Sequence, residues 1–288
     1  MGFGLGLGLG LASGQPQRKK KMDVKYLFID GGCLRATLRK ISERYFDGRT
    51  LKIDYNRLKS DHVKAFYYDA IPAIKNTETD SEYTARIQPR IDLHNQIATL
   101  PGYHIYEGDS RIRRKQVQQK EVDVMIAVDM LTHTFRGNMD RATFLASDID
   151  FKPLLDALVR EGMFVNLLYP PTDTNQDLVN AADQRTPLAI DAIYHFLDQE
   201  SRGSLVLPTC GQETKSNVNH SESTIVTRTQ SLGEIRHKMV KGNHTIYWEY
   251  PQNIDHLLRV ECHDYETLRK YLEDVFLVSI PASPPSGS

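Results

Sequence analysis

Residues 141–171, RATFLASDIDFKPLLDALVREGMFVNLLYPP, constrain the fold of this chain more than any other stretch. Short apolar runs at 141–147 and 163–169 predict two buried strands. Between them, apolar side chains recur at the spacing of an amphipathic helix: Phe151, Leu154, Leu155, Leu158 and Val159. Two strands joined through a helix are parallel, with a right-handed crossover. The sequence therefore predicts an α/β fold with a parallel sheet flanked by helices.

Earlier segments extend this pattern. VKYLFIDGG predicts a buried strand that ends at Asp30, and the two glycines after it allow a sharp turn. Residues 34–46 then have helical character. Residues 62–72 and 103–113 predict two further strands, and the helix between them is expected to begin after Pro89, following a polar loop or helix entry at 75–86.

The segment VDVMIAV, residues 122–128, fits two templates. Its valines and isoleucine alternate as in a strand, and they also fit one side of a helix. Periodicity does not separate these two readings.

Composition and cysteine usage narrow the class of protein. The chain has 288 residues, of which 40% are hydrophobic and 25% charged, with a net charge of -1. This is ordinary for a globular protein, so any nucleic-acid footprint has to be local. The three cysteines are far apart and form no CxxC pair, which fits a reducing, cytoplasmic location without disulfides. No apolar run is long enough for a membrane-spanning helix, so no membrane partner is expected.

The pattern of polar and apolar residues changes after residue 200. Residues 209–223 are polar and loop-like, and residues 224–251 predict antiparallel strands with a turn at KGN. A helix that Asp264 caps is expected next. The predicted organisation is a disordered tail at 1–21, an α/β domain at 22–200, a small α+β domain at 205–280 and a disordered tail at 281–288.

Two aspartates are predicted at the carboxyl ends of strands, where parallel sheets bind ligands. Asp30 and Asp148 follow predicted strands, and ligands bind outside the carboxyl ends of such strands. Asp150 follows at a helix entry. Carboxylates placed together repel each other unless a cation joins them, and an all-oxygen ligand set suits Mg²⁺ or Mn²⁺. Helix capping by Asp150 and a turn role for Asp30 are the alternatives at each position alone.

Three segments carry a resemblance to a known family. FIDGGCL, KEVDVMIAVDM and FLASDIDFKPLLDALVREGMFVNLLYPP, in this order, resemble the NYN domain family and its LabA-like branch, within the PIN-like nuclease superfamily. The resemblance covers roughly residues 22–170. It implies a Rossmann-like sheet and a metal-dependent ribonuclease. It also implies that KEVDVMIAVDM is a helix.

The resemblance assigns roles to individual aspartates. Asp30, Asp123 and Asp148 match the metal-binding cluster, and Asp150 and Asp129 match further acidic positions. Asp123 and Asp129 are six residues apart, about 600° around a helix, so they cannot share one face. Asp123 is the better ligand candidate of the two.

The sequence departs from the family pattern at two places. Gly31-Gly32-Cys33 stands where the family often has an asparagine, and Ser147-Asp148 lacks the usual glycine between the two residues. Neither departure removes a carboxylate.

A basic strip precedes Asp123, and its members are Arg113, Arg114, Lys115 and Lys120. Lysine and arginine beside an acidic metal site would hold the phosphates of a nucleic acid, and Lys120 is nearest to Asp123. A solvated charged loop is the alternative. The main hypothesis is an endoribonuclease that uses Mg²⁺ or Mn²⁺ on single-stranded or structured RNA, with catalytic Asp30, Asp123, Asp148 and Asp150.

Two other readings are weighed against this hypothesis. One is a non-catalytic regulator of the same fold that binds RNA or a protein, with the C-terminal domain offering a surface for a second copy or another partner. The other is a haloacid-dehalogenase-like phosphatase. That chemistry needs a second aspartate two residues after Asp30, and Gly32 stands there, so it is set aside.

Overall fold

The computed structural model describes residues 23–108, 115–203, 205–219, 221, 223–253 and 255–285, with only the backbone at 115–120. The predicted disordered tail at 1–21 lies outside the described residues. So do the side chains of the basic strip, Arg113, Arg114, Lys115 and Lys120. No helix within the described ranges is long and apolar enough to cross a membrane.

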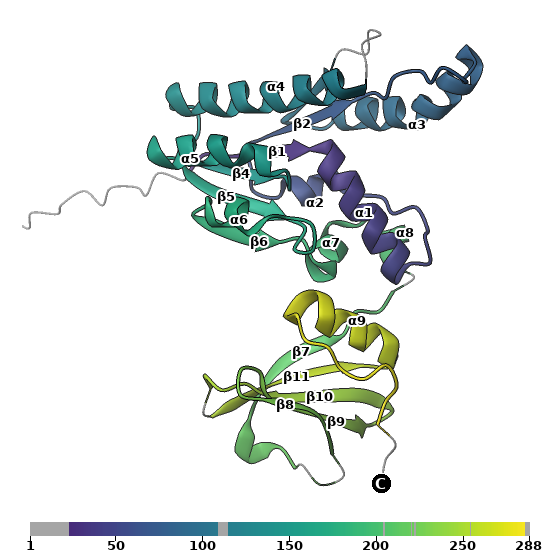
Figure 1. Cartoon of the computed structure of the whole chain (residues 1–288), viewed down its shortest axis with the longest axis vertical. Coiled ribbons are helices and arrows are strands. Elements are labelled where there is room, and N and C mark those ends of the chain that lie inside the picture. The colour runs from purple at the N-terminus through teal and green to yellow at the C-terminus, as the bar shows by residue number, and fades with distance from the viewer. Residues whose placement is uncertain are drawn as a thin grey trace, which may run out of the picture.

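The first part of the chain forms a parallel sheet, as the sequence predicts, and the sheet has six strands (Figure 1). The strand order is β3-β2-β1-β4-β5-β6. The strands are β1 (Lys25–Asp30), β2 (Lys64–Ala70), β3 (Tyr103–Gly108), β4 (Arg141–Leu145), β5 (Phe164–Tyr169) and β6 (Gln184–Pro187). β6 is short, exposed and polar, which explains why no apolar pattern predicts it.

Helices cover both faces of this sheet, because alternate strand residues point to opposite sides. Phe28 and Phe144 belong to the core under α4 (Lys115–Phe135), α5 (Lys152–Arg160) and α6 (Gln176–Asn180). Leu27 and Ile29 belong to the core on the other face. That face carries α1 (Gly31–Tyr45), α2 (Tyr55–Lys59), α3 (Asp80–Ala98) and α7 (Ile190–Phe196).

The segment that periodicity left undecided is a helix. Val122, Ile126 and Met130 of α4 are buried at a spacing of four residues, whereas Val124 and Val128 are 60% and 54% exposed. One helical face therefore packs on the sheet and the other meets solvent. The helix that the family resemblance implies at KEVDVMIAVDM is confirmed.

The predicted start of α3 is wrong. The helix begins at Asp80 and passes through Pro89. Thr79 and Glu82 form a capping box at its start, with the Thr79 backbone N–H donating to Glu82 at 2.8 Å. Arg86 also anchors the first half by donating to Glu78 at 2.7 Å. These contacts offset the single backbone hydrogen bond that a proline removes.

The C-terminal part forms a second, antiparallel sheet of order β7-β11-β10-β9-β8. Its elements are β7 (Thr209–Thr214), β8 (Thr224–Thr229), β9 (Gly233–Val240), β10 (Asn243–Glu249), β11 (His256–Cys262) and α9 (Tyr265–Phe276), and α8 (Gln199–Arg202) leads into it. The predicted turn after β9 and the Asp264 cap are both confirmed, with Asp264 accepting from Thr267 N at 2.7 Å. The prediction of a loop over 209–223 is wrong at β7, which is a strand that pairs with β11. Because its residues are polar and exposed, they show no apolar strand pattern.

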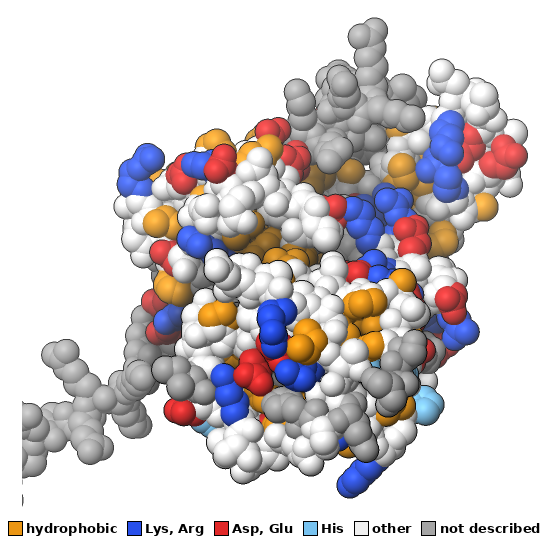
Figure 2. All heavy atoms as spheres, turned by 60° about the horizontal axis from the view of Figure 1, so that its bottom comes forward, with side chains coloured by type: hydrophobic (Ala, Val, Ile, Leu, Met, Phe, Trp, Pro, Cys, Tyr) orange, Lys and Arg blue, Asp and Glu red, His pale blue; other side chains and the backbone are white. Residues whose placement is uncertain are grey.

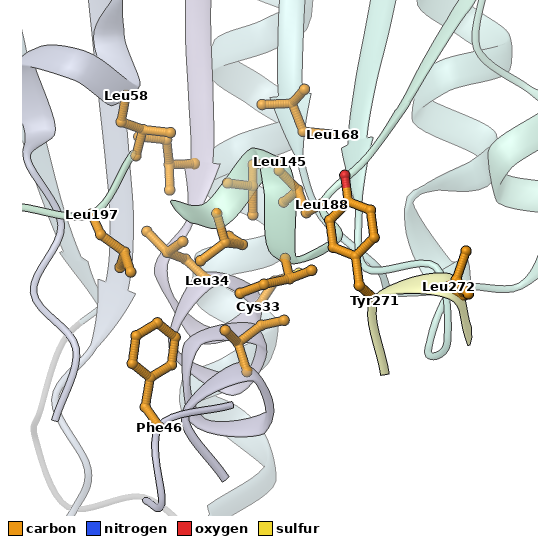
Figure 3. Close-up of a cluster of buried hydrophobic side chains, with 14 of the residues drawn as sticks. Cys33, Leu34, Phe46, Leu58, Leu145, Leu168, Leu188, Leu197, Tyr271 and Leu272 are labelled. Carbon is orange, nitrogen blue, oxygen red and sulfur yellow. The ribbon is translucent and has the colours of Figure 1, made fainter. Parts of the chain in front are cut away.

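The two sheets share one apolar cluster. Tyr271 and Leu272 of α9 belong to the same buried group as Leu188 and Leu197 of the first part (Figure 3). Polar contacts add to it, because Arg44 on α1 donates to Glu273 at 2.8 Å and to Asp274 at 2.7 Å. The helix α9 thus lies between the two sheets (Figure 1).

The turn after β1 requires a glycine. A Cβ added at Gly31 would lie 2.8 Å from the Tyr67 ring and 2.9 Å from the Tyr68 carbonyl oxygen. We predict that Gly31→Ala destabilises the fold by about 1–3 kcal/mol, the usual cost of overpacking a core. Urea unfolding measures this. Gly211→Ala is the control, because a Cβ there meets nothing within 4 Å; equal stability of the two variants would contradict the prediction.

Candidate acidic site

The order in which the chain adds strands to the sheet reverses between β1 and β4. After β1 the chain moves through α1 to β2 on one side, and β4 later pairs with β1 on the other side. Ligands of open α/β sheets bind at the carboxyl ends of strands at such a switch point. Ile29 pairs with Leu145 in this register, so the residues that follow β1 and β4 meet at one edge.

Asp30 ends β1 and caps α1. Its Oδ1 accepts the backbone N–H groups of Gly32 at 2.8 Å and Cys33 at 3.1 Å. Burial raises the pKa of this carboxyl, and these hydrogen bonds together with the charge of Arg35 act against that rise. Both hydrogen bonds use Oδ1. Capping and ligand binding through Oδ2 are therefore compatible, and the two sequence readings of Asp30 do not exclude each other.

Asp148 follows β4, three residues after its last residue, Leu145. Its Oδ1 accepts the backbone N–H of Asp150 at 3.0 Å and so caps the short helical turn Ile149–Phe151. Because β1 and β4 are neighbours, Asp148 and Asp30 stand at adjacent strand ends. The sequence assigned capping first to Asp150, whereas the structure gives the cap to Asp148.

Asp123, on α4, lies within electrostatic range of the other three carboxyls. It is half-buried, and burial raises its pKa to about 6, with the charges of Asp30, Asp148 and Asp150 adding to the rise. We call these four aspartates the acidic group. The structure thus brings the four predicted catalytic residues into electrostatic contact.

Asp129 lies apart from the acidic group. Its Oδ2 accepts a hydrogen bond from the Tyr68 hydroxyl at 2.8 Å. It is not among the charges that raise the pKa of Asp123. The structure therefore does not support the additional acidic role suggested for Asp129, and the separation follows from six residues of helical rotation.

An apolar groove runs from the acidic group between α4 and α5. Asp123 and Asp150 stand at it, and its volume is about 370 Å³. The remaining lining residues are apolar: Val124, Ala127, Leu131, Phe151, Pro153, Leu154 and Ala157. Periodicity predicts each helix but not the space between them, so this groove could not be predicted from the sequence.

A second charged cluster, which the sequence did not predict, lies at the end of β2. Asp69 is only 2% exposed and accepts hydrogen bonds from Arg35 and from His94, the latter at 3.0 Å. Arg90 lies 3.8 Å from the same Asp69 oxygen. Burial would raise the pKa of Asp69, but His94, Arg35 and Arg90 lower it below its ordinary value. The available signal was the carboxylate in YYDA at a strand end.

The acidic group fits a divalent cation in its chemistry. All its donors are carboxylate oxygens, which Mg²⁺ and Mn²⁺ prefer, and the charges around Asp123 are those that a cation would offset. Within the described ranges, however, no three Asp, Glu, His or Cys side chains already form a group that could hold a metal ion. Because backbone hydrogen bonds hold Asp30 and Asp148, binding through all three carboxylates would require the Asp123 side chain to move toward the other two.

A family model and a solved structure match this chain. The family model described as NYN domain matches residues 23–190, which is more than half of the chain. A solved structure described as a protein of unknown function, VPA0982 from Vibrio parahaemolyticus RIMD 2210633, is 18% identical, with a TM-score of 0.39. The match covers 63% of this chain and all of that one. No curated protein matches.

The raised pKa of Asp123 predicts how stability changes with pH. The folded pKa, about 6, exceeds the ordinary value of 3.8. The contribution of Asp123 to stability is therefore full below pH 3.8 and is lost as pH rises through about 6. In EDTA at neutral pH, we predict that Asp123→Asn stabilises the protein by on the order of 1 kcal/mol, because exposure halves the effect.

Urea unfolding of wild type and Asp123→Asn at several pH values measures this difference. The gain should shrink toward zero below about pH 4, where both side chains are neutral. A gain that stays constant with pH, or a loss of stability at neutral pH, would contradict the predicted repulsion.

Proposed function

Because this chain belongs to the NYN domain family, which is part of the PIN-like nuclease superfamily, we propose that it is an endoribonuclease dependent on Mg²⁺ or Mn²⁺. The observation that carries the proposal is the acidic group. Asp30, Asp123 and Asp148 come from two adjacent strand ends and one helix, and Asp150 joins them. We also propose that the chain belongs to the LabA-like branch of this family.

The aspartates of the acidic group would have different roles in catalysis. Asp30, Asp123 and Asp148 would hold the cation, which when bound activates water and offsets charge on the phosphate. Asp30 and Asp148 are fixed by the backbone hydrogen bonds that each accepts, so neither carboxylate has to be ordered during the reaction. Asp150 is exposed at the mouth of the groove and would help orient the water.

The substrate is proposed to be single-stranded or structured RNA. A phosphodiester needs cations beside the carboxylates, since it brings negative charge to an already acidic place. In sequence the basic strip with Arg113, Arg114, Lys115 and Lys120 precedes Asp123, and Lys115 and Lys120 belong to the first turns of α4. We propose that this strip contacts the RNA backbone, with Lys120 nearest to the reacting phosphate.

Cleavage of labelled RNA tests the proposal. We expect cleavage with Mn²⁺, none with EDTA, and a loss of about 100-fold or more for Asp148→Asn, since even residues behind metal ligands cost about 10–100-fold. Asp129→Asn is the matched control and should keep activity within about threefold, because Asp129 bonds Tyr68 instead.

Two outcomes would contradict the proposal. One is cleavage that survives Asp148→Asn. The other is tight RNA binding without cleavage that ignores the metal and tolerates Asp30→Asn, which would identify a non-catalytic binding module of the same fold.

A further inference from the structure

The cluster at the end of β2 lies next to the acidic group. Asp30 pairs with Tyr68 in the sheet register, so Asp69 follows one residue beyond the strand position beside Asp30. The charges of Arg35 and Asp69 both act on the Asp30 carboxyl. Neighbouring strands are about 4.8 Å apart. The two clusters are thus adjacent sites along one edge of the sheet.

Two arginines share one buried carboxylate in this cluster. Arg35 on α1 and Arg90 on α3, here called the arginine pair, both approach Oδ2 of Asp69. His94 donates to the same oxygen at 3.0 Å and contacts Glu107 through its other ring nitrogen at 2.7 Å. Arg90 is further fixed by donating to the Ala70 carbonyl oxygen at 2.8 Å. The guanidinium groups are therefore held in place before any ligand arrives.

The arginine pair still reaches solvent, and its charges are unevenly compensated: against burial, Asp69 and Tyr67 raise the pKa of Arg35. The Arg35 and Arg90 side chains are 32% and 25% exposed, whereas Asp69 is 2% exposed. Burial and the positive charge of Arg35 lower the pKa of Arg90, so the two cations repel each other despite Asp69. A second anion at their exposed edges would relieve this repulsion. Guanidinium groups suit phosphate because they donate two parallel hydrogen bonds.

The face shown in Figure 2 has no broad basic patch among its described residues. Net charge is -1, and on the face in Figure 2 basic and acidic side chains are interspersed. A nucleic-acid strand would thus be held by local groups of cations. The arginine pair is such a group, one strand away from the carboxylates.

We propose that Arg35 and Arg90 form a phosphate-binding subsite for RNA, holding a backbone phosphate next to the one placed at the acidic group. Asp69 and His94 act as positioning residues that fix the two guanidinium groups. The subsite extends the substrate path from β4 and β1 across β2 toward the end of β3, after which the basic strip follows in sequence. This inference rests on RNA being the substrate, as proposed above.

RNA binding in EDTA tests the subsite separately from cleavage. We expect Arg35→Gln to weaken binding of a short single-stranded RNA about tenfold and to reduce the salt slope of log K by about 0.7, the value for one lost phosphate contact on a single strand. Arg39→Gln is the matched control. Arg39 lies one turn later on α1, is 71% exposed and has Glu43 at 3.9 Å, so the same charge change there should alter neither quantity.

Two further measurements keep the test decisive if Arg35→Gln fails to fold. Arg35→Lys retains the charge and should keep the salt slope while weakening binding about threefold. In the wild-type protein, RNA should shift the Nε–H NMR signals of Arg35 and Arg90 and leave that of Arg39 unchanged.

A folded Arg35→Gln with wild-type affinity and slope, or arginine signals that RNA does not move, would overturn the subsite. The test is independent of the proposed activity. Loss of cleavage in Asp148→Asn together with unchanged binding in Arg35→Gln rejects the subsite alone. RNA held through Arg35 but never cleaved rejects the endoribonuclease and keeps the subsite.

Discussion

The parallel pairing of β1 with β4 is the interaction on which the candidate site depends. It places Asp30 and Asp148 near neighbouring strand ends, although they are 118 positions apart in the chain. The long crossover through α4 then brings Asp123 over the same edge, because Val122, Ile126 and Met130 bind that helix to the sheet. Gly31 lets α1 start close against Tyr67, so that Asp30 can cap it. Backbone topology, rather than any local motif, assembles the carboxylates.

The two neighbouring clusters at this end of the sheet shift the pKa of their aspartates in opposite directions. Asp69 is surrounded by cations and its pKa is lowered, so it is an ionised structural group. Burial raises the pKa of Asp123, and the charges of Asp30, Asp148 and Asp150 add to the rise. Uncompensated repulsion of this kind costs stability, which is understandable where a cation is to bind. The combination of an acidic place beside fixed arginines suits a substrate that carries phosphates along a strand.

The sequence predicted the elements with strong apolar periodicity. The β1, β4, α5 and β5 segments and the pairing of β4 with β5 follow from it, as does the expectation that Asp30 and Asp148 lie at strand ends. It failed where polar contacts or pairing partners decide the structure. The start of α3 depends on Thr79 with Glu82, and β7 depends on β11, so neither leaves an apolar pattern. Similarly, the contacts of Asp69 join residues from β2, α1 and α3, and only the folded chain brings them together.

Location of Mn²⁺ in crystals tests the central claim most directly. Crystals of the full chain soaked in Mn²⁺ would be measured for anomalous scattering, with Asp148→Asn crystals treated in the same way. The account predicts a manganese peak bounded by Asp30, Asp123 and Asp148 in the wild type, and its loss in Asp148→Asn. Manganese absent from the acidic group of the wild type, or retained there in Asp148→Asn with unchanged occupancy, would contradict it.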